Sequence, residues 1–301
     1  MPFGGLWESE DQLDQNHGGT VTSSDSTGQV ETDPDVDGAG KLAPSGEPLL
    51  ELRKLSKHFG AVQALTEVDL KVYPGMVTAL VGDNGAGKSV TLKTIAGIHP
   101  PDGGQIYWQG QPVHIRTPRE SASLGIETVY QDLALCNNLD IVQNMFLGRE
   151  RTRRALMDEN AMETAAVQTL TSLSVTTVSS VRQVVASLSG GQRQAVAVAK
   201  AVMWNSKLVI MDEPTAALGV AQTAMVLALT KRLAQRGLGV IFVSHNFNDV
   251  FEVADQIAVL YLGRLVASIP AAHLDRQMVV DLVTTGTTTR DVPGQIRPNG
   301  A

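Results

Sequence analysis

The chain has 301 residues, of which 43% are hydrophobic and 18% charged, so it accommodates one large core but is short for two independent modules. No stretch reaches the roughly 18 apolar residues of a membrane-spanning helix, and we expect no secretory signal peptide and, with the single Cys136, no internal disulfide. Residues 49–301 carry 23 basic and 21 acidic side chains, a balance that excludes the clustered basic excess typical of nucleic-acid binding.

Residues 1–48 form an acidic segment with ten carboxylates and one basic side chain, Lys41. The segment is rich in Gly, Ser, Thr, Asp and Pro and has no sustained apolar period. Such a composition buries too little apolar surface to offset the entropy of ordering the chain. We therefore expect a disordered tail before a domain over residues 49–270.

Short apolar runs and longer stretches at helical spacing alternate from residue 49 onward, which predicts an α/β fold. The runs at residues 77–81, 208–211 and 240–243 are apolar without alternation, as in parallel strands that are buried on both faces. The segments 49–55, 64–72 and 105–115 alternate more and end at Gly and Pro, which indicates an antiparallel sheet beside the parallel one.

Residues 82–89, GDNGAGKS, directly follow the first apolar run and fit the spacing of a phosphate-binding loop. Glycines in this loop allow backbone N–H groups to face phosphate oxygens, and the next helix adds its N-terminal dipole. Lys88 is expected to reach the β- and γ-phosphates, and the Ser89 hydroxyl to bind Mg²⁺. A Gly-rich turn with a surface lysine is the alternative. The predicted contacts to the nucleotide are Gly82, Asp83, Asn84, Gly85, Ala86, Gly87, Lys88, Ser89 and Val90.

Strand signals fade between residues 133 and 187, where we expect a helical subdomain inserted into the sheet domain. One helical face there is traced by small and apolar residues: Ala161, Met162, Ala165, Ala166, Leu170 and Leu173. Residues 274–283 are compatible with a short amphipathic helix, followed by a loose end, so that residues 271–301 form a separate C-terminal region.

Residues 188–192, LSGGQ, open a helix that we expect over residues 195–203. Ser189, Gly190, Gly191 and Gln192 place a hydroxyl and bare backbone at a helix N-terminus, which is a second phosphate site. One nucleotide does not need two such sites from one chain. We therefore expect a twofold homodimer in which each ATP lies between the 82–89 loop of one copy and the 188–192 segment of the other. An ordinary Ser-capped helix is the alternative for this segment alone.

Residues 207–213, KLVIMDE, form an apolar strand that ends in two carboxylates. Asp212 is expected to hold Mg²⁺ through water, and Glu213 to orient and deprotonate the attacking water as a general base. An acidic pair after a strand is otherwise only the start of a loop, so the assignment depends on the loop at residues 82–89.

These motifs occur together with Gln131 in VYQD and His245 in FVSHN. In this order and approximate spacing they resemble the nucleotide-binding subunits of ATP-binding cassette (ABC) transporters, over about residues 49–270. The resemblance implies an α/β P-loop NTPase core with a mainly parallel sheet, an N-terminal antiparallel β subdomain and an inserted α-helical subdomain. It implies ATP hydrolysis, with ATP and Mg²⁺ as cofactors.

The resemblance also implies roles that the residues alone leave open. Phe59 in KHFGAVQAL matches the aromatic residue that stacks on adenine, although by itself it is typical of core packing. Gln131 matches the glutamine that senses the γ-phosphate and Mg²⁺, and His245 the switch histidine that contacts the γ-phosphate. Read alone, these are a polar loop residue and a structural histidine.

Two positions depart from the family pattern. Val90 stands where a second hydroxyl residue commonly follows Ser89, so one side-chain contact to the α-phosphate is missing. Gly219 stands where many members carry aspartate, which makes communication across the dimer through that loop the least secure expectation.

The stretches YQDLALCNNLDIVQNMFLGRE and HNFNDVFEVADQIAVLYLGR resemble the ATPases of bacterial monosaccharide importers of the ribose, xylose and fructose type. Many of those carry two cassettes in one chain, whereas this chain has one and no internal repeat, which again implies a homodimer. The implied partners are integral membrane permease subunits and, indirectly, an extracellular or periplasmic sugar-binding protein. The implied location is the cytoplasmic face of the plasma membrane, as a peripheral protein.

Three alternatives remain at this point. A cassette that drives an exporter of lipids or drugs uses the same ATP chemistry. A soluble cassette ATPase in DNA maintenance or translation also carries these motifs, but usually with long coiled coils or two cassettes. A regulatory nucleotide switch without turnover is disfavoured by the presence of both Glu213 and His245.

Overall fold

The computed structural model describes residues 46–154 and 156–288, all within one unit of the chain, Gly40–Ala301. Nearly all of the expected acidic tail, residues 1–48, and the loose end after residue 288 lie outside the described residues. Those two expectations therefore stay predictions.

The central sheet has six strands among the described residues, in the order β12 (Arg264–Pro270), β11 (Gln256–Tyr261), β3 (Val77–Val81), β10 (Gly239–Val243), β9 (Leu208–Asp212) and β6 (Ile126–Val129). All neighbours pair in parallel except β11 and β12, which are antiparallel. The predicted parallel strands are confirmed, and every residue of β3 and β10 is buried. The sequence interpretation missed β6, β11 and β12.

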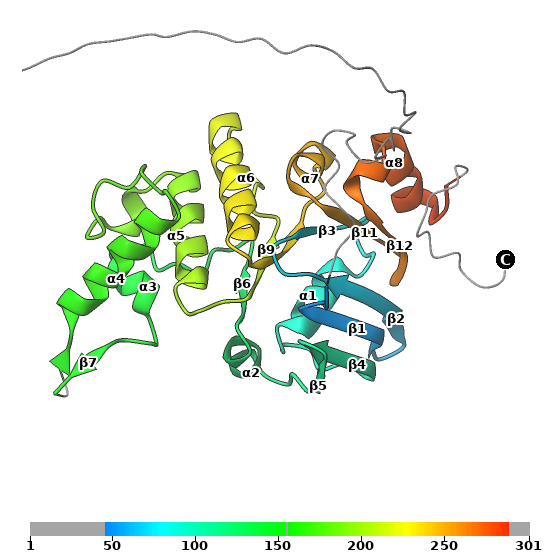
Figure 1. The fold of residues 1–301 in the computed structure, drawn as a ribbon, viewed down its shortest axis with the longest axis horizontal. Helices are drawn as coiled ribbons and strands as arrows, with labels where there is room; N and C mark the ends of the chain where they lie inside the picture. Colours follow the sequence, from blue (N-terminus) through cyan, green and yellow to red (C-terminus); the bar gives the residue numbers. More distant parts are fainter. Residues whose placement is uncertain (1–45, 155, 289–301) are drawn as a thin grey trace, which may run out of the picture. The chain divides into compact units, whose positions relative to one another are not determined.

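An antiparallel sheet precedes and flanks the central one, as expected (Figure 1). It has the order β2 (Val62–Val72), β1 (Leu50–Phe59), β4 (Gly103–Trp108) and β5 (Gln111–Val113). The predicted strand over residues 105–115 is instead the hairpin β4–β5, because the left-handed Gln109 and Gly110 reverse the chain.

Helices cover both faces of the central sheet (Figure 1). Successive strand residues point to opposite faces. Leu80, Ile210 and Ile241 pack in one hydrophobic cluster with α1 (Lys88–Ile95) and the antiparallel sheet. The other face of the sheet shares its cluster with α6 (Val220–Gln235), α7 (Phe247–Val253) and α8 (Arg276–Thr285). The C-terminal helix α8 thus packs in the same core as the strands, through Val279 and Leu282.

The expected helical stretch, residues 133–187, contains α3 (Ile141–Phe146) and α4 (Glu159–Ser172), and α5 (Gly190–Val202), which follows it, packs against both. On the predicted face of α4, three residues are buried in the same hydrophobic cluster as α3 and α5: Met162, Ala166 and Leu170. The subdomain also contains a small hairpin, β7 (Thr152–Arg153) with β8 (Leu156–Met157), which the sequence interpretation missed. The remaining elements are α2 (Pro118–Ser123) and two short 3₁₀ turns, Val185–Ser187 and Ala271–His273.

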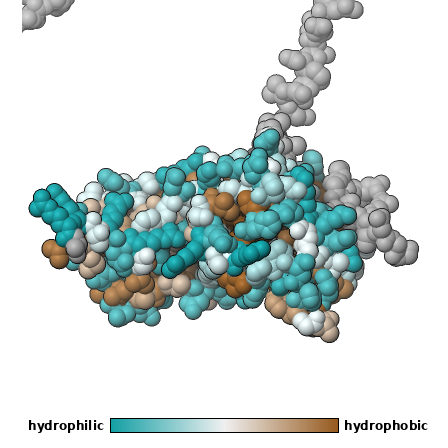
Figure 2. Space-filling view, turned by 90° about the horizontal axis from the view of Figure 1, so that it is seen from below, coloured by the Kyte–Doolittle hydropathy of each residue, from teal (hydrophilic) through white to brown (hydrophobic). Residues whose placement is uncertain are grey.

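Within the described residues, no helix has the length and apolar character needed to cross a membrane. On the face drawn in Figure 2, hydrophilic residues dominate and apolar residues form separate patches.

A buried amide fixes the chain where it enters the helical subdomain. The Asn144 side chain is fully buried, and its Oδ1 accepts a hydrogen bond from Cys136 N at 2.7 Å. Its Nδ2 donates to the carbonyl oxygens of Cys136 and Asp140 at 3.0 and 2.9 Å. The segment between the central sheet and α3 is therefore tied to the first turns of that helix.

Asn144→Ala should lower the free energy of unfolding by about 2–3 kcal/mol, because it removes a buried side chain and the hydrogen-bond acceptor of the partly buried Cys136 N–H. Urea unfolding followed by circular dichroism measures this. The neighbouring Gln143→Ala, which removes only an exposed capping side chain, should cost at most about 1 kcal/mol. Equal losses for the two variants would contradict this role of Asn144.

Candidate nucleotide site

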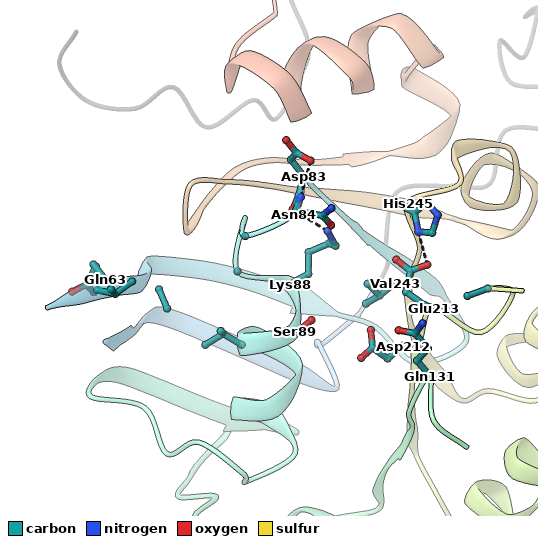
Figure 3. Close-up of a pocket in the computed structure, with 16 residues that line it drawn as sticks. Gln63, Asp83, Asn84, Lys88, Ser89, Gln131, Asp212, Glu213, Val243 and His245 are labelled. Carbon is teal, nitrogen blue, oxygen red and sulfur yellow. Dashed lines mark hydrogen bonds and ion pairs between the residues drawn. The ribbon is translucent and has the colours of Figure 1, made fainter. Parts of the chain in front are cut away.

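A cavity of about 450 Å³ opens at the carboxyl end of the central sheet (Figure 3). Open α/β sheets bind ligands at this edge because the loops that follow the strands converge there. The cavity brings together eleven of the predicted site residues: Asp83, Asn84, Gly85, Gly87, Lys88, Ser89, Val90, Gln131, Asp212, Glu213 and His245. Five further residues, which the sequence interpretation did not assign to the site, complete its lining: Val62, Gln63, Ala64, Ala216 and Val243.

The loop between β3 and α1 presents bare backbone to this cavity. Gly87 is the N-cap of α1 with φ 103°, and no side chain caps the helix. A Cβ at Gly87 would lie 2.7 Å from Leu65 Cδ2 and 3.0 Å from the Ala64 oxygen, so only glycine fits. The uncapped N–H groups of the first turn are therefore available to an anion.

Lys88 reaches back over the loop that precedes it. Its Nζ donates hydrogen bonds to the carbonyl oxygens of Gly82 at 2.6 Å and Asp83 at 3.0 Å. Burial lowers the pKa of Lys88, while the carboxylates of Glu213, Asp83 and Asp212 act in the opposite direction. The ammonium thus lies between loop carbonyls and two carboxylates, where a phosphate oxygen offers a further acceptor.

Two carboxylates end β9 beside Lys88. Asp212 is about half-buried, and burial, followed by the adjacent Glu213, raises its pKa. Glu213 has a left-handed backbone, φ 48°, which is strained for a residue with a side chain. Its N–H donates to the Val243 oxygen at 3.0 Å, so the turn is held to the end of β10.

His245 pairs with the second of these carboxylates. Its Nδ1 lies 2.9 Å from Glu213 Oε2 (Figure 3). The parallel register that places Val243 opposite Asp212 explains why two side chains 32 positions apart meet. The Glu213 side chain is only 16% exposed, whereas that of His245 is 74% exposed, so the pair has one buried and one accessible member.

The donor set fits Mg²⁺. Asp212, Ser89 and Gln131 supply carboxylate, hydroxyl and amide oxygens to the same cavity. Mg²⁺ prefers such hard oxygen donors and is usually held by one or two carboxylates plus substrate phosphates. Within residues 46–154 and 156–288, no cluster of three or more His, Cys, Asp or Glu residues forms a metal cage.

The predicted residues of the 188–192 segment do not line this cavity. Ser189 caps α5, and its hydroxyl accepts a hydrogen bond from Gln192 N at 3.3 Å while the Gln192 side chain accepts one from Ser189 N at 2.8 Å. A Cβ at Gly191 would lie 2.9 Å from Met225 Cε and 3.0 Å from Gln222 Cβ, so this glycine packs closely against α6. The segment thus forms a second exposed helix start apart from the cavity.

Phe59, Gly82 and Ala86 also lie outside the lining. Gly82 and Ala86 face the strands behind the loop: a Cβ at Gly82 would lie 2.4 Å from the Leu260 oxygen, and Ala86 is buried. Phe59 ends β1 opposite Val62, which lines the cavity. Phe59 therefore lies at the margin of the cavity and is 43% exposed.

Val90 and Gly219 are the two positions that depart from the family pattern. Val90 lines the cavity with an apolar side chain. Gly219 is the N-cap of α6, which has no side-chain cap and no acidic residue in its first turn. Because Gly219 stands where many family members carry aspartate, the start of α6 lacks the carboxylate that is usual at this position.

Residues 65–216 match the family model described as ABC transporter. The chain is 49% identical to the fructose import ATP-binding protein FrcA of Rhizobium meliloti over 225 residues, which cover 72% of this chain and 86% of that protein. The chain belongs to the ABC transporter family. Members of this family are ATPases, so the chain is an ABC-type ATPase that binds nucleotide.

Other relatives of this cassette are also named for import. It is 43% identical to the xylose/arabinose import ATP-binding protein XylG of Sulfolobus acidocaldarius, covering 79% of this chain and 94% of that one. It is 37% identical to the ribose import ATP-binding protein RbsA 2 of Escherichia coli O157:H7 across 84% of this chain. The chain spans about half, 51%, of that ribose protein.

Solved structures of ABC cassettes confirm the predicted fold. A nucleotide-free ATP-binding cassette from an ABC transporter superposes with a TM-score of 0.66 at 24% identity, covering 74% of this chain and 92% of that one. An ATP-binding cassette in its ADP conformation superposes with a TM-score of 0.69 at 23% identity, covering 80% and 96%.

The missed lining residues had a weak signal in the sequence. Val62, Gln63 and Ala64 follow Phe59 after a short Gly-Ala turn, so they begin the strand β2 that returns beside the loop. Ala216 and Val243 each lie within three residues of a predicted catalytic side chain. Pairing of strands, which one sequence does not specify, decides that these residues line the cavity.

Asp212→Asn should raise the unfolding temperature of the nucleotide-free cassette at pH 7. Because the folded-state pKa of Asp212 is raised, the wild type loses stability as pH increases from the ordinary carboxyl value near about 4 through the higher folded value. Thermal unfolding from pH 4 to pH 8 measures the difference, which should shrink toward acid pH. Asp132→Asn, at an exposed carboxylate, is the control. A difference independent of pH would contradict this account.

Proposed function

We propose that this ABC cassette hydrolyses ATP to energise the import of a monosaccharide, and that two copies form two shared ATP sites. The observation that carries the catalytic proposal is the convergence of Lys88, Asp212, Glu213 and His245 on one cavity. The fructose, xylose/arabinose and ribose import names of the relatives support a monosaccharide as cargo and argue against an exporter or a soluble ATPase.

The loop at residues 82–89 holds the triphosphate through its backbone N–H groups and through Lys88. Asp212, Ser89 and Gln131 would hold Mg²⁺, which supplies charge neutralisation for the β- and γ-phosphates. Burial, followed by the adjacent Glu213, raises the pKa of Asp212, and a bound cation would favour the charged form of this carboxyl.

Glu213 accepts a proton from a water molecule whose oxygen attacks the γ-phosphorus. The bond between the γ-phosphorus and its bridging oxygen breaks, and ADP and inorganic phosphate leave. The hydrogen bond from His245 fixes the orientation of the Glu213 carboxylate, and the exposed imidazole lies at the mouth of the cavity, where it can contact the γ-phosphate.

The second copy would supply Ser189, Gly190, Gly191 and Gln192 to the open side of each site. Support comes from their position at a helix start that does not line their own cavity and at which Ser189 is exposed. A related-fold ABC transporter cassette, 24% identical and with a TM-score of 0.63, is described as dimeric. Closure of the pair around ATP would move permease subunits at the cytoplasmic face of the membrane, and a separate sugar-binding protein would deliver the cargo.

Glu213→Gln should reduce ATP turnover by about 10²–10⁴-fold while ATP binding is retained, because only the proton acceptor is lost. Lys88→Ala should instead weaken ATP binding itself. Phosphate release and equilibrium binding of ATP measure the two effects. Glu150→Gln, at an exposed carboxylate of the helical subdomain, is the matched control.

Retained turnover in Glu213→Gln would refute the catalytic assignment. The import assignment is tested separately, by uptake of labelled fructose, xylose and ribose in cells without this gene. Uptake of one of them should return with the wild-type chain and not with Glu213→Gln. Unchanged uptake of all three sugars in the deleted cells would contradict a role in importing these sugars.

A further inference from the structure

A small aromatic and apolar surface lies at the margin of the proposed nucleotide cavity. Phe59 and Val62 are 43% and 66% exposed, and Ile98, which precedes His99, is 40% exposed. Val62 lines the cavity and pairs directly with Phe59 across the β1–β2 hairpin. Through Val62 the surface borders the same cavity that Lys88 and Ser89 line.

The loop that follows α1 is fastened to the end of β1 beneath this surface. Lys57 Nζ donates to the Pro100 oxygen at 2.8 Å and pairs with Asp102 Oδ1 at 3.0 Å. The other Asp102 oxygen accepts a hydrogen bond from His58 N at 2.7 Å and lies 2.6 Å from His58 Nδ1. These contacts hold the loop and the strand end as one rigid piece.

His99, in this loop, contacts the Phe59 ring directly. The two ring centroids lie 5.1 Å apart with an interplanar angle of 79°, which is the edge-to-face arrangement that aromatic pairs favour. The Lys57 ammonium lies 5.4 Å from the centre of the same phenyl ring. Phe59 is thus braced by two partners, yet much of its ring surface remains free.

We propose that His99 is a positioning residue that holds the Phe59 ring as the platform for the nucleobase, so that the cassette selects purine over pyrimidine triphosphates. This proposal rests on the proposed ATP site. A purine has a larger stacking face than a pyrimidine, and stacking on an aromatic side chain contributes about 1–3 kcal/mol per base. A mobile phenyl ring would lose part of that gain to ordering entropy, which the contact with His99 removes in advance.

The test compares three ligands, ATP, CTP and inorganic tripolyphosphate, by titration calorimetry on the full chain in the Glu213→Gln background, which prevents turnover. His99→Ala should weaken ATP binding by about fivefold, equivalent to about 1 kcal/mol, and CTP binding by less. Binding of tripolyphosphate, which has no base, should not change. His99→Phe should restore ATP binding.

His58→Ala is the matched control, because it removes a neighbouring histidine that touches Asp102. It should change the ATP affinity by less than about twofold. An equal loss of ATP and tripolyphosphate in His99→Ala, failed rescue by His99→Phe, or an unchanged ATP affinity in His99→Ala would overturn the proposal. Failure of the Glu213→Gln chain itself to bind ATP would instead refute the proposed function.

Discussion

A protein binds a triphosphate stably only where many hydrogen-bond donors converge on it. In this chain the uncapped start of α1 offers such donors. Burial of β3 fixes where the loop begins, and the lack of space at Gly87 fixes where the helix starts. Lys88 then lies over the loop, and the parallel strands β9 and β10 bring carboxylates and a histidine to the same edge. The rest of the fold keeps this edge in place.

The same edge holds a strained backbone and two neighbouring carboxylates. Glu213 has a left-handed backbone, and Asp212 carries a raised pKa because it is half-buried beside another carboxylate. Such features cost stability and are concentrated at functional sites. The helix start at Ser189, in contrast, satisfies its own capping hydrogen bonds and does not line the cavity. One protomer thus carries two separate helix starts, and we propose that the second acts on the nucleotide of a partner copy.

Short contiguous motifs in the sequence were sufficient to predict the central elements of the proposed nucleotide site. Three features are each predicted by a pattern of only a few neighbouring residues, and the structure contains all of them. They are the loop at residues 82–89, the strand ending at Asp212 and the start of α5. Gln131 and His245 lie far from Lys88 in sequence, and only the resemblance to a family assigned them, because strand register brings them together. The strands β11 and β12 and the hairpin β4–β5 were missed or merged, since pairing partners decide whether short apolar runs form strands. His99 gave no signal at all before its contact with Phe59 was seen.

The central claim is that each ATP site needs residues of two chains, and complementation between defective chains tests it most directly. Lys88→Ala and Ser189→Arg chains, each inactive alone, are mixed under conditions that allow subunits to exchange. The mixed dimer has one site with both defects and one site with none, so ATP turnover should reappear. A chain that carries both substitutions, mixed with wild type, has one defect in each site and should stay inactive in the mixed dimer. Recovery in neither mixture, although the chains exchange, would contradict a shared site.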